Sequence, residues 1–210
     1  GRADEDYAYE CKERLRLMTI GKEDVKVTVH YERDIPLQPG VNEKRPFGTL
    51  SVGKHEDVAE VLLKEGLAVT QRHRDDDPTS PRYDELRAAE AAAKEAKQGV
   101  HSTKDYKKLS INDQTDPRKA KAHSGALIRA KTIKAMVDFV FNGALFKLYI
   151  PSENCYIRFA PGSIRCPQPS PSPGARLAGK AAEPFGDEAK RHSKLNLMQR
   201  QVEIDCQNVT

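Results

Sequence analysis

The chain has 210 residues, of which 38% are hydrophobic and 31% are charged, and its formal net charge is only +4. These values allow one large domain or two small ones, and they exclude a polycationic chain, so a nucleic-acid interface would require local clusters of cations. Neither a signal peptide nor a run of about 18 apolar residues is present, which predicts a soluble intracellular protein without a membrane-spanning helix.

The cysteines and the first residue add two expectations. Cys11, Cys155, Cys166 and Cys206 are widely spaced and form no CxxC pair, which favours reduced thiols over a zinc site. The chain begins at Gly1 without an initiator methionine, so we expect a piece of a longer protein.

The first half of the chain changes between helical and strand patterns. Apolar residues recur at helical spacing in residues 4–20 and alternate with polar ones in residues 25–33, which predicts a helix and then a half-buried strand. Three prolines and a glycine predict a loop at 34–46. A short strand at 47–52, a helix ended by Gly66, and a helix that begins at Ser80 and Pro81 and runs to about residue 97 complete this half.

The middle of the chain has weaker patterns. Residues 103–131 are predicted to form a basic linker, in which Asp116 and Pro117 start a short helix. Cations in and next to this linker are interspersed with few acids: Arg118, Lys119, Lys121, Arg129, Lys131 and Lys134. A solvated charge run and a nucleic-acid contact both remain open for this pattern.

The densest apolar run lies at residues 132–167. Val137, Phe139 and Phe141 recur with the period of a strand, and Asn142 and Gly143 suit a tight hairpin turn. Residues 145–150 and 155–160 then predict a second and a third strand. Three such strands form half of a small barrel. They cannot close a barrel alone, because the edges of the outer strands would stay unpaired.

A proline-rich loop at 165–182, a helix that begins at Glu183 and Pro184, and a strand at 201–209 follow this run. Two of these segments repeat the start of the chain. Residues 7–17 match residues 185–195 with an offset of 178, and residues 25–29 match residues 202–206. A repeat of this length is that of a domain, so the chain is expected to end one domain copy and begin the next.

The order of these elements resembles the staphylococcal nuclease fold, an OB-type five-stranded barrel with three helices. The motifs FNGALFKLYIPSENCYIRF, EPFGDEAKRHSKL, VAEVLLKEGLAV and YDELRAAEAAAKEAKQGVHS carry the resemblance. More closely, the chain resembles the Tudor staphylococcal nuclease family, where the third nuclease-like repeat runs into the fourth. The predicted class is α+β, with residues 1–102 ending one repeat, 103–131 as the linker and 132–210 starting the next.

The resemblance also implies that neither half is a complete barrel. The first half lacks strands one to three, and the second half supplies them together with a helix and a strand. We therefore expect the halves to complete a barrel with each other, within one chain or by exchange between two chains.

The resemblance places the family's catalytic positions on residues that lack its chemistry. The two calcium-binding aspartates fall at Ala144 and Arg165, the third-strand arginine at Ala160 and the proposed base at Gln168. Phosphodiester cleavage needs metal and guanidinium groups that stabilise the charge on the phosphate, so we expect no catalysis by this chain. Arg158 lies two residues before the arginine position and is not counted as its replacement.

The resemblance further implies that two base-facing aromatic positions fall at Arg72 and Arg74. Guanidinium groups in place of aromatic rings favour contact with the nucleic-acid backbone over stacking on bases. Pairing with the neighbouring acids at 75–77 is the alternative. The predicted nucleic-acid-binding set is Arg72, Arg74, Lys119, Lys121 and Arg129.

Three functions remain open. The first is a non-catalytic nuclease-like module that binds RNA weakly and without sequence preference, or binds proteins, as a scaffold in RNA processing, silencing or transcription coactivation. The second is a metal-dependent ribonuclease, and the third is a scaffold for proteins alone. No cofactor is expected, with calcium implied only for the ribonuclease. Partners are RNA, other proteins and an exchanged second copy rather than a membrane, and the expected location is the cytoplasm with a further nuclear pool.

Overall fold

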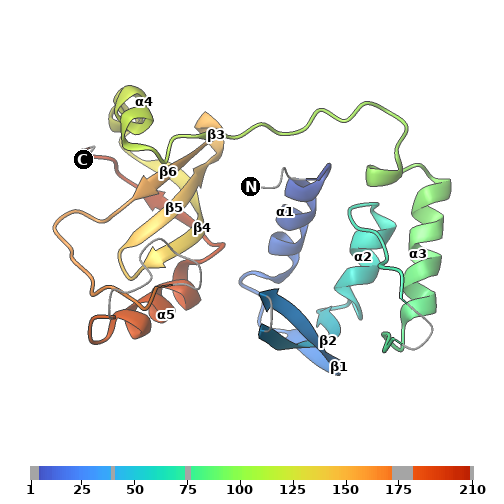
Figure 1. Ribbon diagram of the computed structural model, residues 1–210. Helices are drawn as coiled ribbons and strands as arrows, with labels where there is room; N and C mark the ends of the chain where they lie inside the picture. The colour runs from blue at the N-terminus through green and yellow to red at the C-terminus, as the bar shows by residue number, and fades with distance from the viewer. Residues whose placement is uncertain (1–4, 39–40, 74–76, 172–181, 209–210) are drawn as a thin grey trace. The chain divides into compact units, whose positions relative to one another are not determined.

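The computed structural model describes residues 5–38, 41–73, 77–171 and 182–208. The chain divides into two compact units, residues 1–109 and 110–210, each described by itself (Figure 1). The linker predicted at 103–131 falls on both sides of this division. The short basic helix predicted within it is found in the second unit, at Pro117–Arg129. No helix in the described ranges is long and apolar enough to cross a bilayer.

The first unit consists of a long hairpin and helices. Its elements in chain order are α1 (Ala8–Thr19), β1 (Val25–Gln38), β2 (Val41–Val52), α2 (Val58–Lys64), α3 (Tyr83–Glu95) and the 3-10 turn η1 (Gly99–His101). β1 pairs with β2 in antiparallel fashion, from Val25 opposite Val52 to Gln38 opposite Val41. The predicted loop at 34–46 is therefore wrong, since most of it extends the hairpin. A two-stranded ribbon tolerates its prolines because both strands have a free edge.

A small apolar core joins α1, the end of β2 and α2. Met18, Val52, Val58 and Leu62 are its buried members. Asp57 caps α2 by accepting a hydrogen bond from the backbone N–H of Ala59 over 2.9 Å.

Gly66 ends the last turn of α2 as predicted, with φ +67°. A Cβ atom there would lie 2.3 Å from the carbonyl oxygen of Gln98, so glycine is required for the close approach of the two segments.

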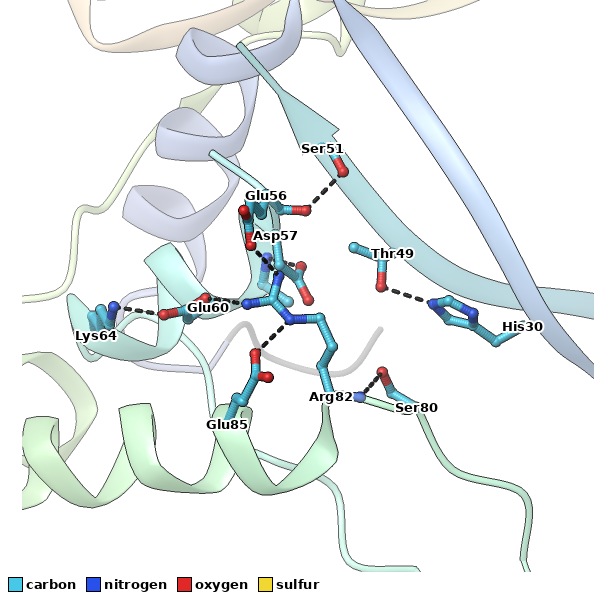
Figure 2. A network of polar contacts seen from close by, with 11 residues as sticks. His30, Thr49, Ser51, Glu56, Asp57, Glu60, Lys64, Ser80, Arg82 and Glu85 are labelled. Atoms are coloured by element: carbon cyan, nitrogen blue, oxygen red, sulfur yellow. Dashed lines mark hydrogen bonds and ion pairs between the residues drawn. The ribbon is translucent and has the colours of Figure 1, made fainter. Parts of the chain in front are cut away.

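Ion pairs connect α2 with α3 around Arg82, the residue before α3 (Figure 2). Its guanidinium lies 3.0 Å from a carboxylate oxygen of Glu60 on α2 and 2.5 Å from one of Glu85 on α3. Lys64 binds the other oxygen of Glu60 over 2.6 Å. The hydrogen bond from Lys64, followed by the nearby charges of Lys64 and Arg82, lowers the pKa of Glu60 against the opposing effect of burial.

The second unit contains a five-stranded sheet. Its elements in chain order are β3 (Asn112–Asp113), α4 (Pro117–Arg129), β4 (Ile133–Asn142), β5 (Leu145–Ile150), the 3-10 turn η2 (Pro151–Glu153), β6 (Cys155–Phe159), α5 (Gly186–Leu197) and β7 (Gln201–Ile204). The strand order is β3-β6-β5-β4-β7, and α4 and α5 lie at opposite ends of the sheet (Figure 1).

The inward faces of these strands form one apolar core. Val137, Leu148, Ile150, Cys155 and Ile157 are among its buried members. The three central strands therefore form as the sequence predicted.

The α+β class is confirmed, but a single closed barrel is not found. In the described part of the chain, β1 and β2 form a sheet of their own, and the five other strands form a second one. Completion of one barrel within this chain is therefore wrong for the described residues. Exchange between two chains stays a prediction.

Candidate nucleic-acid interface

The outer face of strands β4, β5 and β6 carries aromatic and cationic side chains. β5 and β6 pair so that Lys147 lies opposite Arg158 and Tyr149 opposite Tyr156. Residues directly opposite in an antiparallel pair share one face of the sheet, and the alternate residues of these strands are buried in the core. Lys147, Tyr156 and Arg158 therefore point away from the core.

Phe139 and Phe141 of β4 lie on this outer face too, although the sequence pattern placed them with Val137. The pairing register shifts between Val137 and Phe139, as in a β-bulge. A shift of one residue moves the following side chains to the other face. As a result Val137 is buried, whereas 43% of the surface of Phe139 is exposed.

Cations lie directly over aromatic rings on this face. The Nζ atom of Lys147 is 3.9 Å from the ring centre of Tyr156, and the Cζ atom of Arg158 is 4.8 Å from that of Phe141. The Phe139 and Phe141 rings meet edge to face with their centres 5.1 Å apart. Cation–π contacts at exposed sites stabilise by about 0.5–1 kcal/mol each, which fixes the orientation of the charged groups. We call Phe139, Phe141, Lys147, Tyr156 and Arg158 the aromatic–cation face.

A pocket of about 610 Å³ opens between this face and the start of α4. Lys147 is only loosely paired in it, since its Nζ atom is 4.0 Å from a carboxylate oxygen of Asp138. Arg158 has no carboxylate partner within the described ranges. The pocket is thus lined by an arginine that lies over the ring of Phe141, with Phe139 in the same lining.

Asp113 shows that Lys119 of α4 belongs to the same neighbourhood. Hydrogen bonds from Thr115 lower the pKa of Asp113, burial opposes them, and the charges of Lys147 and Lys119 lower it further. The charge of Lys119, one of the predicted linker cations, thus acts on Asp113, which pairs with Tyr156 of the aromatic–cation face.

The other predicted binding residues are exposed but do not form one surface. Lys119 and Lys121 are two positions apart on α4, so their side chains leave the helix on different sides, and Arg129 lies at its other end. Arg72 is exposed in the first unit and lines a separate pocket of about 770 Å³ together with Arg87. Arg74 lies outside the described residues.

The predicted alternative for Arg72, pairing with the acids that follow it, is not found where it can be examined. Asp77 binds Arg33 over 3.0 Å instead. Within the described ranges Arg72 pairs with no carboxylate. Asp75 and Asp76 lie outside those ranges.

The structure shows what surrounds each position that the resemblance assigned to catalysis. Ala144 is buried, and its backbone N–H donates to the Oδ1 atom of Asn142 over 2.9 Å in the hairpin turn. Ala160 is exposed immediately after β6. Arg165 donates through Nη2 to Glu183 over 3.1 Å, and the backbone N–H of Gln168 donates to the other oxygen of Glu183 over 3.0 Å.

The hydrogen bonds that Glu183 and Asp187 accept were not predicted from the sequence. Asp187 accepts hydrogen bonds from the N–H and Oγ of Ser170 over 2.9 and 2.6 Å. The two carboxylates therefore hold residues 165–170 against the start of α5. The signal available in the sequence was the position of these two acids next to the start of a helix. Acids at such positions mark the N-terminus of a helix, but they do not show which residues the carboxylates will bind.

The residues present at the implied calcium site do not fit this ion. Calcium takes six to eight oxygen ligands, mostly carboxylates and carbonyls. The implied positions hold alanine and arginine, and the described residues contain no group of three or more His, Cys, Asp and Glu side chains that could hold a metal. The expectation of no metal stays a prediction.

Comparison with known proteins gives a consistent result. Residues 1–103 match the family described as "Staphylococcal nuclease homologue". Over 97% of its length the chain is 36% identical to "Ribonuclease TUDOR 2" of Arabidopsis thaliana, of which it covers 22%. Over 94% of its length it is 33% identical to "Staphylococcal nuclease domain-containing protein 1" of Drosophila melanogaster, of which it covers 21%. The chain thus spans about a fifth of the length of these curated relatives.

Proposed function

Because this chain belongs to the staphylococcal nuclease family in its Tudor-containing branch, we propose that it is a non-catalytic, RNA-binding module of a larger scaffold. The observation that carries the proposal is the aromatic–cation face, where Lys147 and Arg158 lie over the rings of Tyr156 and Phe141. Roles of the whole protein in RNA processing, silencing or transcription coactivation, in the cytoplasm with a nuclear pool, are part of the proposal.

The place of this face in the fold supports RNA as the ligand. OB-type folds bind oligonucleotides on the outer face of their second and third strands. β5 and β6 are the second and third strands of the antiparallel run β4-β5-β6 in the second unit, and they carry Lys147, Tyr156 and Arg158. A phosphate can approach the two cations while a base stacks on Phe139, whose ring is the most exposed of the set.

The chemistry of this face favours single-stranded RNA without sequence preference. Every base has a flat surface that can stack, whereas the bases of a duplex are already stacked on each other. Lysine and arginine read phosphate position and not base identity. We expect dissociation constants on the order of micromolar or weaker, in the range of non-specific binding.

The absence of catalysis is proposed from the residues themselves. Arg165 is a cation that repels calcium, and Glu183 already binds two hydrogen-bond donors. Removal of one charge-stabilising donor costs about a hundred- to a thousandfold in rate, and here the whole implied set is replaced. A ribonuclease activity of the larger protein would then depend on residues elsewhere.

The test is RNA binding measured by fluorescence anisotropy over a range of salt concentrations. Lys147→Ala combined with Arg158→Ala is expected to weaken binding at least tenfold and to reduce the salt slope by about 1.4, since each phosphate contact on a single strand contributes about 0.7. Phe139→Ala is expected to weaken binding about five- to a hundredfold, the loss of one stacked base, with the salt slope unchanged.

Arg191→Ala is the matched control, because Arg191 is exposed on α5 and has no carboxylate partner in the described part of the chain. If the double variant binds RNA like this control, the aromatic–cation face is not the interface. If neither the parent nor the variants bind RNA, the scaffold for proteins alone replaces the present proposal.

A further inference from the structure

The two copies of the internal repeat begin their helices in the same unusual way. α1 and α5 each have 12 residues and lie exactly one repeat offset apart. The residue before each helix is aromatic and left-handed, with φ 61° at Tyr7 and φ 63° at Phe185. Neither residue caps its helix with a side-chain hydrogen bond. A left-handed backbone is unfavourable for residues other than glycine, so an aromatic ring held there twice calls for a reason.

In the first copy another segment covers the ring. Tyr106 stacks on Tyr7 with the ring centres 4.0 Å apart and the planes 26° apart. Its hydroxyl donates to the Oε1 atom of Glu10 over 2.7 Å. Lys108 adds a contact of 3.5 Å to Asp6. The extended segment after η1 is thus fastened to the start of α1 by one ring, one hydroxyl and one ammonium group.

In the second copy the same place is uncovered. Phe185 exposes 76% of its surface, the largest fraction of any large hydrophobic residue in the described ranges. Glu188 stands at the position that corresponds to Glu10 and is exposed as well. Neither side chain has a ring contact, hydrogen bond or ion pair in the described part of the chain, although the backbone carbonyl of Phe185 accepts the N–H of Ala189 over 3.0 Å. The receptor groups for a tyrosine are therefore present without a tyrosine.

We propose that Phe185 and Glu188 form a docking site for an extended peptide segment that contains a tyrosine, of the kind formed by residues 102–109. The tyrosine ring stacks on Phe185, and its hydroxyl donates to the carboxylate of Glu188. Pro184 stands where the first copy has Asp6, so the lysine contact is not reproduced. Recognition depends on the ring and the hydroxyl.

The covered copy explains why the occupant is a peptide segment and not RNA. The ring of Tyr7 is contacted on its face by a side chain of an extended chain, and the partner of the hydroxyl is a carboxylate, which repels phosphate. Glu188 places the same negative charge beside Phe185. The site therefore differs in its charge from the aromatic–cation face.

The proposal is tested with the whole chain labelled with ¹⁵N and titrated with the synthetic peptide STKDYKKL, which has the sequence of residues 102–109. Amide signals near Phe185 and Glu188 are expected to shift in a saturable way at millimolar peptide, because the tether that raises the local concentration in the first copy is missing. Signals near Tyr7 are expected to stay, since its ring is already covered.

Three changes make the test specific. Phe185→Gly is expected to weaken binding at least fivefold while keeping the fold, since glycine adopts the left-handed conformation without strain. Glu188→Ala, and alanine or phenylalanine in place of the peptide's tyrosine, are expected to weaken it too. Leu195→Ala is the control, because Leu195 is a comparably exposed apolar residue on the same helix.

Unchanged peptide binding by Phe185→Gly, or shifts that are not saturable, would overturn the proposal. Shifts near Phe185 that depend on protein concentration without peptide would assign this surface to a second copy of the chain and would also overturn it. Lys147→Ala combined with Arg158→Ala should leave peptide binding intact, so the outcome does not depend on the RNA-binding proposal.

Discussion

Arg165 and Glu183 form an ion pair of 3.1 Å at the position where the family resemblance expects a metal-binding aspartate. The pair reverses the local charge and ties the loop after β6 to the segment before α5. Because the second carboxylate oxygen of Glu183 accepts the backbone N–H of Gln168, this acid is occupied by the protein itself. The loop to which the resemblance assigned a catalytic position is thus held to the start of α5 by hydrogen bonds and an ion pair.

The first prediction is that this chain does not cleave RNA. Single-stranded RNA incubated with purified chain and millimolar calcium should remain intact on a denaturing gel, because none of the implied carboxylates is present to hold the ion. An authentic nuclease of the family serves as the positive control. Cleavage that copurifies with the chain through a second column and stops on addition of a chelator would contradict this prediction.

The second prediction concerns Gly66. Alanine there would have to keep φ +67° and would bring its Cβ atom to 2.3 Å from the carbonyl oxygen of Gln98. Gly66→Ala should therefore lower the free energy of unfolding of the first unit by about 2 kcal/mol or more, measured by urea denaturation. Gly21→Ala is the matched control: it has φ +76° but nothing within 4 Å, so only the backbone cost of about 1 kcal/mol should appear. Equal losses in both variants would show that the contact with Gln98 is not tight.

The strands of the two units show where prediction from the sequence succeeded and where it failed. The strands at 145–150 and 155–160 were predictable, the second to within one residue, because short apolar runs there are bounded by turn residues at 142–143 and 151–154. The hairpin that joins β1 and β2 was not, because prolines usually mark loops and only a ribbon with free edges tolerates them. Side chains in such a ribbon give no signal of burial, since few of them are buried.

The aromatic–cation face was missed for a different reason. The residues were visible in the sequence, but two register shifts, between Val137 and Phe139 and between Val140 and Asn142, decide which face Phe139 and Phe141 occupy. The residue types of such a strand do not reveal where its pairing register shifts. Arg158 was not counted as a replacement for the family arginine, although its offset of two residues places it on the same face of a strand.

The third prediction is a pH dependence that originates at Tyr106. The hydrogen bond to Glu10, burial and the charge of that carboxylate raise the pKa of Tyr106 to about 12. Because the folded-state pKa lies above the unfolded value of about 10, the contribution of this contact to stability is complete below pH 10 and is lost as the pH rises toward 12. An absorbance titration should show one tyrosine that ionises late, and Tyr106→Phe should remove it. If all seven tyrosines still ionise together in the parent, the hydrogen bond is absent.

The fourth prediction concerns exchange between two copies of the chain. Val27 corresponds in the internal repeat to Ile204, which is buried where β7 pairs with β4, yet Val27 exposes 65% of its surface on β1. We expect this strand to associate with the sheet of a second copy, so the chain should form dimers at high concentration in multi-angle light scattering. Val27→Lys should shift it toward monomer by at least tenfold in the dissociation constant, while Val69→Lys, a change at a similarly exposed valine outside the strands, should not. A parent that stays monomeric at millimolar concentration contradicts the exchange.

The last prediction weighs the arginines of the first unit against the aromatic–cation face. Arg72 is exposed and lines a pocket with Arg87, His73 and Tyr83, whose two rings meet edge to face with their centres 5.2 Å apart, and neither arginine change removes a ring. Arg72→Ala combined with Arg74→Ala should therefore weaken all RNA sequences about equally and reduce the salt slope by roughly one to two, without the further loss of stacking that Phe139→Ala produces. Anisotropy with two RNAs of unrelated sequence measures both effects. If the double variant keeps the parental affinity and salt slope, RNA is bound by the second unit alone.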